Sequence, residues 1–379
     1  MRSKHDDISR CKLRTTARSG SEAASFSKSR CVPGDRREKC QLADGFTGDS
    51  TWLVITADSD CLLSDSRFAT QIEEECAGVP ARIRDASMKM LELLQECLSA
   101  FQPERCGFEG HSLTFETAQA LQSLPIVDQW TPVNWEIEQF RSVKDREEIA
   151  EIREAVRIAE RGLAFFKSIL SPDLTEQELS AELEHGLRRF GATGCSFPSI
   201  IGVGDRAALP HYRPGDRKIS EAPFVLLDWG ARLPSGYCSD LTRTMWTGKT
   251  PAGKGDRTFE KVYKTVLHAQ LSAISLIAPG ISCREVDAAA RQVIQKAGYG
   301  QYFGHGLGHG IGLDVHELPR FSQLSDAVLK PGMVVTVEPG IYLPGWGGVR
   351  IEDDVLVTRN GCEVLSSCPK GWDSVTVNC

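Results

Sequence analysis

The feature that most constrains the fold of this chain of 379 residues is a diverged internal repeat. Residues 174–179 read Leu-Thr-Glu-Gln-Glu-Leu and open a predicted helix with a capping box, in which the Thr and Glu side chains satisfy backbone N–H groups. Residues 281–286, Ile-Ser-Cys-Arg-Glu-Val, repeat this box 107 positions later. The two helices are predicted to close near Gly191 and Gly298, each before a loop and a β-rich stretch. Two related halves are therefore expected, arranged about a pseudo-twofold axis.

Each half also delivers two carboxylates from predicted strands. A strand ends at Asp228 in the first half and at Glu338 in the second, 110 positions further on. Asp240 and Glu352 follow at comparable positions, 112 apart. The pseudo-twofold arrangement would bring all four carboxylates to one central site.

Four carboxylates in one pocket would repel each other and take up protons unless a cation lay among them. Divalent metal ions are the natural counter-ions, and oxygen ligands with a single imidazole favour Mn, Co, Fe or Zn over a thiolate-bound structural zinc. Two such ions bridged by carboxylates can share a hydroxide that attacks a carbonyl carbon. The repeat thus indicates metal-dependent hydrolysis.

The stretch at residues 305–317 is rich in glycine and histidine. Its four glycines permit close backbone approach beside His305, His309 and His316. A glycine-rich loop can also cradle a phosphate, but no Lys stands in the Walker position and no strand–loop–helix pattern surrounds the stretch. A phosphate-binding loop is therefore disfavoured.

The period of two residues in a strand places further polar groups beside the carboxylates. Arg350 and Glu352 fall on one strand face, so that Arg350 can steady the carboxylates or hold a carboxylate of the substrate. Asp240 and Thr242 likewise share a face, which predicts that the Thr242 hydroxyl supports Asp240 or a water molecule at the metal site.

Composition excludes several classes of function. With a net charge of −7, the chain has no overall positive field that would attract nucleic acid or a membrane surface. Thirteen scattered cysteines without zinc-ligand spacing, and no secretory segment, favour a cytoplasmic protein with reduced thiols. The longest apolar stretch, residues 271–281, is interrupted and too short to span a bilayer.

The chain divides into three predicted regions. Residues 1–42 are basic, rich in Ser and poor in apolar side chains, which predicts a disordered segment. Residues 43–138 alternate predicted strands and helices, as expected of a small α/β domain. Residues 139–379 form the remainder and begin with a long helix that Asp145 and Glu148 are predicted to cap.

Within the small domain, the pattern predicts a strand at residues 52–57, a turn at residues 58–60 and a second strand at residues 61–63. Residues 86–100 carry apolar side chains at helical spacing and are predicted to form a helix.

Five motifs in this order resemble the creatinase/aminopeptidase P/prolidase family of pita-bread metallopeptidases. They lie at residues 227–230, 239–244, 305–317, 337–342 and 349–353. The resemblance implies an α+β fold, with a pita-bread catalytic domain of two pseudo-twofold halves after a small α/β domain of the creatinase type. The strand and helix that open the small domain in the family are not evident here. A homodimer is also implied by resemblance.

The same resemblance assigns roles to individual residues. The implied ligands of two divalent ions, Mn²⁺ first and Co²⁺, Zn²⁺ or Fe²⁺ as alternatives, are Asp228, Asp240, His309, Glu338 and Glu352. The implied catalytic residues are His211, His316, Glu338 and Arg350. Substrate-binding positions are matched by His305 and Tyr342.

The resemblance implies hydrolysis of the peptide bond before proline, in small peptides with proline in the second position. This bond is a tertiary amide without an N–H group, which general peptidases handle poorly. The motifs occur in aminopeptidases that act on longer peptides and in dipeptidases, and both remain open. A methionine-aminopeptidase-like enzyme lacks the small domain and an equivalent of Arg350. A non-catalytic binding protein on this scaffold would have lost ligands that are present here.

Overall fold

The computed structural model describes residues 46–56, 60–133, 136–249 and 256–377, so the segment predicted to be disordered, residues 1–42, lies outside the described residues. The chain divides into two compact units, with the boundary between Phe140 and Arg141 in helix α6 (Glu136–Arg141). Each unit contains its own clusters of buried apolar side chains. No helix among the described residues is long and apolar enough to cross a membrane.

The first unit opens with a three-stranded sheet of β1 (Trp52–Ile55), β2 (Asp60–Asp65) and β3 (Ala81–Arg84). β1 and β2 are antiparallel, whereas β3 follows the crossover helix α3 (Ala69–Glu75) and runs parallel to β2. All four residues of β1 are buried, which explains its apolar composition. Asp60, predicted to lie in a turn, belongs to β2.

The remainder of the first unit contains two helices and a parallel pair of strands. They are α4 (Met90–Ser99), β4 (Arg105–Glu109), α5 (Phe115–Gln122) and β5 (Gln129–Val133). The helix predicted at residues 86–100 is α4, which begins later than its apolar spacing suggested because residues 85–89 form a turn.

The second unit begins with α7 (Arg146–Ile169), whose predicted cap is confirmed. The Asp145 side chain accepts hydrogen bonds from two backbone N–H groups of the first turn, and Glu148 completes the capping box. The apolar face of α7 packs on the first repeat, where the indole of Trp229 donates to the carbonyl of Ala159 over 2.9 Å. α7 thereby fixes the strand that carries Asp228.

The first repeat consists of α8 (Glu176–Arg189) and a three-stranded antiparallel sheet in the order β10-β8-β7. The predicted capping box at Thr175 is present. The strands and short elements of this repeat are β6 (Gly194–Cys195), β7 (Ile200–Val203), η1 (Gly204–Ala208), η2 (Ile219–Glu221), β8 (Phe224–Trp229), β9 (Ala231–Arg232) and β10 (Leu241–Trp246).

The second repeat consists of α10 (Arg257–Ile274), α11 (Cys283–Lys296) and a five-stranded sheet in the order β12-β11-β13-β16-β17. The capping box at Ser282 is also present. The sheet and the β14–β15 hairpin are built from β11 (Gly308–Gly310), β12 (Glu317–Phe321), β13 (Val334–Val337), β14 (Gly340–Leu343), β15 (Gly347–Arg350), β16 (Asp353–Val357) and β17 (Cys362–Val364). The 3-10 turns η3 (Gly300–Tyr302) and η4 (Trp372–Ser374) complete it.

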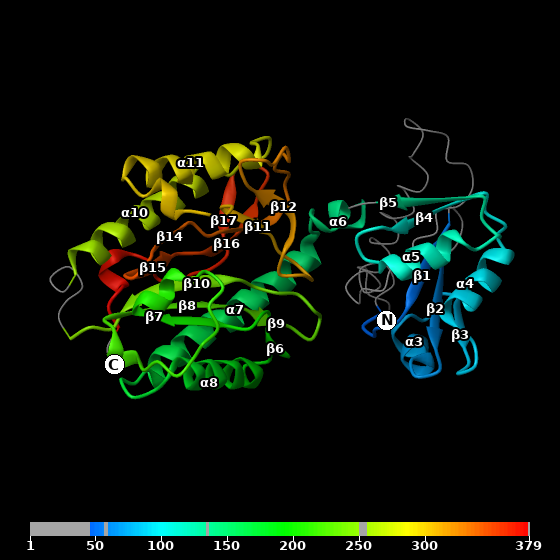
Figure 1. The fold of residues 1–379 in the computed structure, drawn as a ribbon, viewed down its shortest axis with the longest axis horizontal. Helices are drawn as coiled ribbons and strands as arrows, with labels where there is room; N and C mark the ends of the chain where they lie inside the picture. Colours follow the sequence, from blue (N-terminus) through cyan, green and yellow to red (C-terminus); the bar gives the residue numbers. More distant parts are fainter. Residues whose placement is uncertain (1–45, 57–59, 134–135, 250–255, 378–379) are drawn as a thin grey trace. The chain divides into compact units, whose positions relative to one another are not determined.

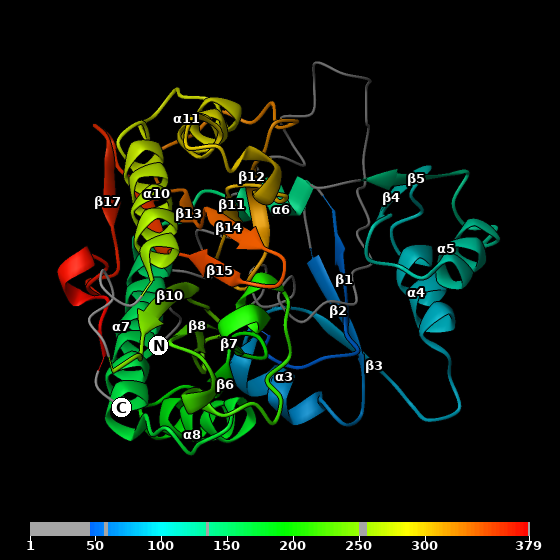
Figure 2. The ribbon, with the colours of Figure 1, turned by 60° about the vertical axis from the view of Figure 1, so that its left-hand side comes forward.

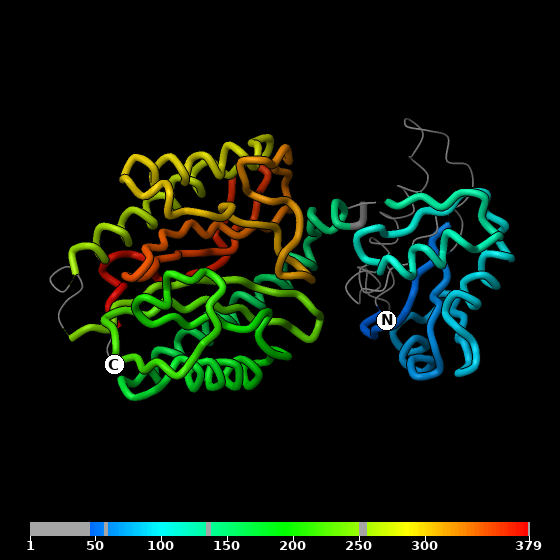
Figure 3. The backbone as a smooth tube through the Cα atoms, viewed as in Figure 1, coloured from blue at the N-terminus to red at the C-terminus, as the bar shows by residue number. Residues whose placement is uncertain are grey.

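The two repeats join along their strands. Strands β7, β8, β10, β14 and β15 lie between α8 on one side and α11 on the other (Figures 1 and 2). The tube in Figure 3 follows the first repeat in green and the second in yellow to red. The backbone N–H of Glu352 donates to the carbonyl of Thr242 over 3.1 Å, which bridges the two sheets beside the predicted site.

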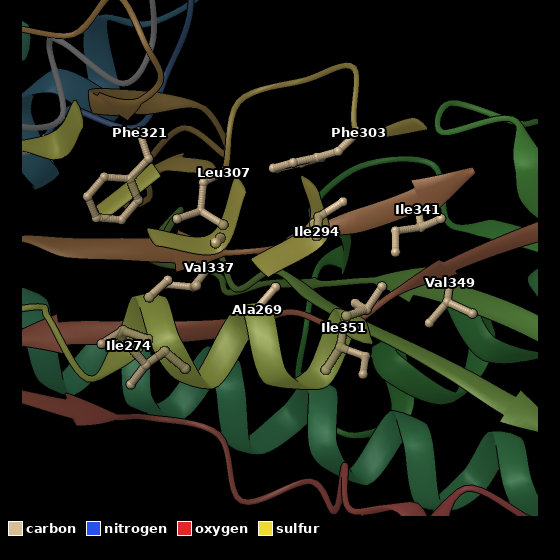
Figure 4. Close-up of a cluster of buried hydrophobic side chains, with 14 of the residues drawn as sticks. Ala269, Ile274, Ile294, Phe303, Leu307, Phe321, Val337, Ile341, Val349 and Ile351 are labelled. Carbon is tan, nitrogen blue, oxygen red and sulfur yellow. The ribbon is translucent and has the colours of Figure 1, made fainter. Parts of the chain in front are cut away.

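Apolar packing holds the carboxylate-bearing strands of the second repeat in place. Figure 4 shows Val337 and Ile351 in one cluster with Ala269 of α10 and Ile294 of α11. All four side chains are fully buried. Because neighbouring side chains in extended chain point to opposite faces, burial of Val337 and Ile351 directs the next residue of each strand away from this core.

Candidate metal centre and active site

The carboxylates and the imidazole predicted to hold metal ions line one cavity of about 1210 Å³. They come from strand ends in both repeats and are Asp228 in β8, Asp240 before β10, His309 in β11, Glu338 after β13 and Glu352 before β16. Residues separated by more than a hundred positions therefore meet, as the repeat predicts.

Three of these side chains have the spacing of a shared metal site. Asp240, His309 and Glu352 each offer a ligand atom, and the three atoms lie within 4.8 Å of one another. The Nε2 atom of His309 is 3.8 Å from Oδ2 of Asp240 and 3.3 Å from Oε1 of Glu338. All four side chains belong to the wall of the same cavity.

Burial makes this group of carboxylates unfavourable without a cation. Burial first, and then the charges of neighbouring carboxylates, raise the pKa of Asp240 and Glu352 well above their usual values. Burial also raises the pKa of Asp228, although Arg350 opposes the shift. Within the described residues, Oδ1 of Asp228 and Oε1 of Glu352 are buried and accept no hydrogen bond. Divalent ions would satisfy these oxygen atoms, so the residues present suit the metal ions that the sequence implies.

Glu338 differs from the other carboxylates. Burial would raise its pKa, but the hydrogen bond and charge of His309, with the nearby His305 and Arg350, lower it below the usual value. Glu338 is thus the one carboxylate of this group whose pKa the surrounding side chains lower.

Arg350 and Thr242 organise the floor of the cavity. The Arg350 guanidinium donates to Asp228, to the Tyr342 hydroxyl over 2.9 Å and, through Nε, to Oγ1 of Thr242 over 3.1 Å. The Thr242 hydroxyl donates to Oε2 of Glu352 over 2.6 Å. Thr242 was predicted to support Asp240 or a water molecule at the metal site. The first alternative is wrong, because the bridge between the repeats brings the Thr242 hydroxyl to Glu352, and the second stays a prediction.

The other predicted site residues also line the cavity. His305 and Tyr342 share a hydrogen bond of 2.9 Å, and burial lowers the pKa of His305. The ring of His316 packs edge-on against His309, with 4.4 Å between the ring centres. His211 also lines this cavity, so all ten predicted side chains surround one space.

Known families match both units. The model of metallopeptidase family M24 matches residues 150–359, and that of the creatinase/prolidase N-terminal domain matches residues 43–143. The chain belongs to metallopeptidase family M24. The M24 match covers every residue predicted to line the site.

Relatives in sequence support this membership. The chain is 37% identical over 326 residues to the uncharacterized peptidase YqhT of Bacillus subtilis, which covers 86% of this chain and 90% of YqhT. It is 41% identical over 262 residues to the putative dipeptidase YkvY of the same organism, with coverage of 69% and 70%.

Solved structures of M24 enzymes share the fold of this chain. The Xaa-Pro dipeptidase from Bacillus anthracis is 34% identical and superposes with a TM-score of 0.88 over 99% of this chain and all of that one. The X-Pro aminopeptidase from Thermotoga maritima is 31% identical, with a TM-score of 0.83 and coverage of 93% and 97%. The predicted pita-bread fold with a creatinase-type first domain is confirmed, and this M24 protein is a metallopeptidase.

Sequence reasoning did not single out several residues of this M24 site. Arg213 and Arg320 line the cavity and bring positive charge to a site dominated by carboxylates. In the β11–β12 ladder, Arg320 is the direct partner of His309, and a bulge follows between His309 and Gly310. A strand period of two residues does not predict a bulge, so the spacing of residues in the sequence could not predict that His309 pairs with Arg320.

A second group of possible ligands lies in the first unit. Glu109, His111 and Glu138 bring one ligand atom each within 4.8 Å of one another. The Nε2 atom of His111 is 2.8 Å from Oε1 of Glu138, and the two side chains share a hydrogen bond.

A buried ion cluster anchors the loop that carries His316. Glu317 accepts hydrogen bonds from Arg141 and, over 2.8 Å, from Lys144. Arg141 also pairs with Asp314 over 3.0 Å. The three residues Arg141, Lys144 and Glu317 are almost fully buried, so the cluster holds together only while its charges balance.

We expect Glu317→Gln to reduce the free energy of unfolding at pH 7 by about 3 kcal/mol, because two buried cations lose their counter-charge. Arg141 and Lys144 outweigh the effect of burial and lower the pKa of Glu317 from 4.5 to about 2. Because the pKa of Glu317 is lower in the folded than in the unfolded chain, its ionised carboxylate adds to the free energy of unfolding above pH 4.5. This contribution is lost as the pH falls from 4.5 toward 2. Denaturant unfolding of wild type and variant across this range measures the difference.

The exposed ion pair between Arg153 and Glu363 is the matched control for Glu317→Gln. Glu363→Gln should change the free energy of unfolding by less than about 1 kcal/mol, because solvent screens that pair. An equally small effect of Glu317→Gln would contradict the anchoring role of the buried cluster.

Proposed function

We propose that this metallopeptidase hydrolyses the peptide bond that precedes proline, with two divalent ions in the carboxylate cavity. The proposed ligands are Asp228, Asp240, His309, Glu338 and Glu352. The observation that carries the proposal is the gathering of these side chains from both repeats, four of them buried, with carboxylate oxygens that accept no hydrogen bond from the described residues. Mn²⁺ is the first candidate for both ions.

Divalent ions bound here would supply a water nucleophile at neutral pH and polarise the scissile carbonyl. The Glu338 carboxylate accepts the proton that this water gives up, because its lowered pKa leaves it ionised before the reaction. His316 donates an N–H group toward the carbonyl oxygen of the substrate, where negative charge develops. Arg350 fixes Asp228 and Tyr342 and so holds one wall of the site rigid.

The positive side chains around the carboxylates favour a short substrate with a free carboxylate. Arg213 and Arg320 line the same cavity as the proposed metal ligands. His211 lines it too, where its imidazole can form a hydrogen bond with the substrate. A dipeptide places its carboxylate one residue from the scissile bond, within the reach of such groups. The similarity to the Xaa-Pro dipeptidase from Bacillus anthracis supports this preference. We therefore propose Xaa-Pro dipeptides as the preferred substrates, with release of the first residue from longer Xaa-Pro peptides as the alternative.

Purified protein loaded with Mn²⁺ should cleave Gly-Pro faster than Arg-Pro-Pro and faster than Gly-Pro amide, which lacks the free carboxylate. Release of the first residue, measured by chromatography, gives kcat and KM for each peptide. Gly-Ala and Met-Ala serve as controls for proline selectivity. Faster cleavage of Arg-Pro-Pro would favour an aminopeptidase, and preference for Met-Ala would overturn the proline assignment in favour of a methionine-aminopeptidase-like activity.

A further inference from the structure

Glu176 is a fully buried carboxylate in the first turn of α8. The capping box of this helix uses its neighbours, because Thr175 accepts from the backbone N–H of Glu178 and Glu178 accepts from that of Thr175. Glu178 is exposed, as is usual for an acidic residue at a helix start. The cap therefore leaves Glu176 for a different task.

The Glu176 carboxylate accepts three hydrogen bonds from the chain that leaves β7. Its Oε1 atom accepts from the backbone N–H of Val203 over 2.8 Å. Its Oε2 atom accepts from the Tyr212 hydroxyl over 2.8 Å and from the backbone N–H of Gly215 over 3.0 Å. A carboxylate accepts through both oxygens, so it closes the segment from residue 203 to residue 215 into a loop.

His211 lies within this loop and lines the proposed active site. It is the residue before Tyr212, one of the three donors to Glu176. On the other side, the carbonyl of Pro210 is 3.5 Å from a guanidinium nitrogen of Arg350. The backbone around His211 is thus held between a buried carboxylate and an arginine of the site.

The Tyr212 hydroxyl remains a donor in this arrangement. Burial first, and then the hydrogen bond to Glu176, raise the pKa of Tyr212 to about 12, so the phenol stays protonated at neutral pH. Two backbone N–H groups and one phenol thus meet two oxygens. The side-chain amide of Gln would set an NH₂ group against at least one of these donors.

The second repeat contains a corresponding device. Asp287 of α11 is fully buried and accepts from the backbone N–H of Leu307 over 3.2 Å and from the Arg291 guanidinium. The same guanidinium donates to the carbonyl of His305 over 2.9 Å. In both repeats, a buried carboxylate in the helix with the capping box holds a loop that bears a histidine of the cavity.

We propose that Glu176 is a positioning residue that sets the place of His211 in the active site. This inference rests on the proposed function, in which His211 contacts the substrate. Glu176 does not line the cavity itself and acts through the loop that it closes.

A double-mutant cycle tests this coupling. Glu176→Gln should lower kcat for Gly-Pro about tenfold by displacing His211, with the content of bound Mn²⁺ unchanged. In a His211→Ala background, the same substitution should lower kcat no further, because the group that it positions is already gone. Glu178→Gln, two residues further along the helix and exposed, is the matched control and should leave kcat unchanged in both backgrounds.

The alternatives give distinct results. Equal losses from Glu176→Gln in both backgrounds would show a general structural role and overturn the inference. Full activity of His211→Ala would refute the role of His211 in the proposed function, and a loss in Glu176→Gln alone would then show that Glu176 acts elsewhere. If Glu176→Gln does not fold, Tyr212→Phe decides: it removes one donor, and its loss of kcat should also vanish in the His211→Ala background.

Discussion

Asp240→Asn should lower kcat/KM for Gly-Pro by about a thousandfold, which corresponds to about 4 kcal/mol of lost transition-state stabilisation. Asp240 offers a ligand atom within 4.8 Å of those of His309 and Glu352. An amide keeps the shape of the side chain but removes the negative charge that divalent ions require. Steady-state kinetics and metal analysis of the purified variant measure both consequences.

The same substitution should have opposite effects on stability with and without metal. In metal-free protein, burial and the charges of Glu352 and Asp228 raise the pKa of Asp240, so the ionised form destabilises the fold at neutral pH. Asp240→Asn removes this repulsion and should raise Tm in the presence of a chelator, by about 3 °C. With Mn²⁺ added, the wild type gains stability from binding and the variant gains less, so the order reverses.

The exposed residue Asp326 provides the control for Asp240→Asn. Its side chain is 91% exposed, so its charge is surrounded by solvent and not by buried carboxylates. Asp326→Asn should change neither activity nor the response of Tm to metal. Retained activity in Asp240→Asn, or a change of Tm with the same sign in both conditions, would contradict a metal centre at this position.

The meeting of the four carboxylates was predictable because each depends on a local pattern. An acidic residue directly after an apolar run marks the end region of a buried strand. Asp228 follows such a run and is the next-to-last residue of β8, and Glu338 follows the last residue of β13. The repetition of this pattern after a repeated capping box makes convergence at a pseudo-twofold axis the simplest arrangement. Local chemistry and its repetition were sufficient here.

Contacts between the repeats were less predictable. The Thr242 hydroxyl reaches Glu352, 110 positions away, because a backbone bridge joins the two sheets at this point. Strand period alone placed Thr242 on the same face as Asp240, two residues earlier in the chain. Spacing within one strand identifies which face a side chain occupies, but not which side chain of another sheet it meets.

Glu176 shows a further limit of sequence reasoning. An acidic residue in the first turn of a helix is typical of the exposed surface, and the sequence beside the capping box did not distinguish Glu176 from such a residue. Its burial depends on the loop from residue 203 to residue 215, whose path follows no repeating pattern. The same reason explains why Arg213, in the same loop, was not recognised as a cavity residue.

The other large effect is expected at His316. Replacement by Ala should lower kcat for Gly-Pro by about 100-fold to 1000-fold, the loss seen when one donor to a developing oxyanion is removed. Burial and the charge of His309 lower the pKa of His316 to about 4, so its imidazole is neutral at pH 7 and keeps an N–H group to donate. A neutral ring also avoids repulsion with bound cations.

The measurement that isolates this role is kcat together with metal content. Because His316 is outside the proposed ligand set, His316→Ala should retain two Mn²⁺ per chain. The control is His268→Ala, at an exposed position of α10, which should retain both the metal and full activity. His316→Gln should recover part of the loss, since its amide also donates a hydrogen bond. Loss of metal from His316→Ala would instead place His316 among the ligands, because its ring lies only 4.4 Å from that of His309.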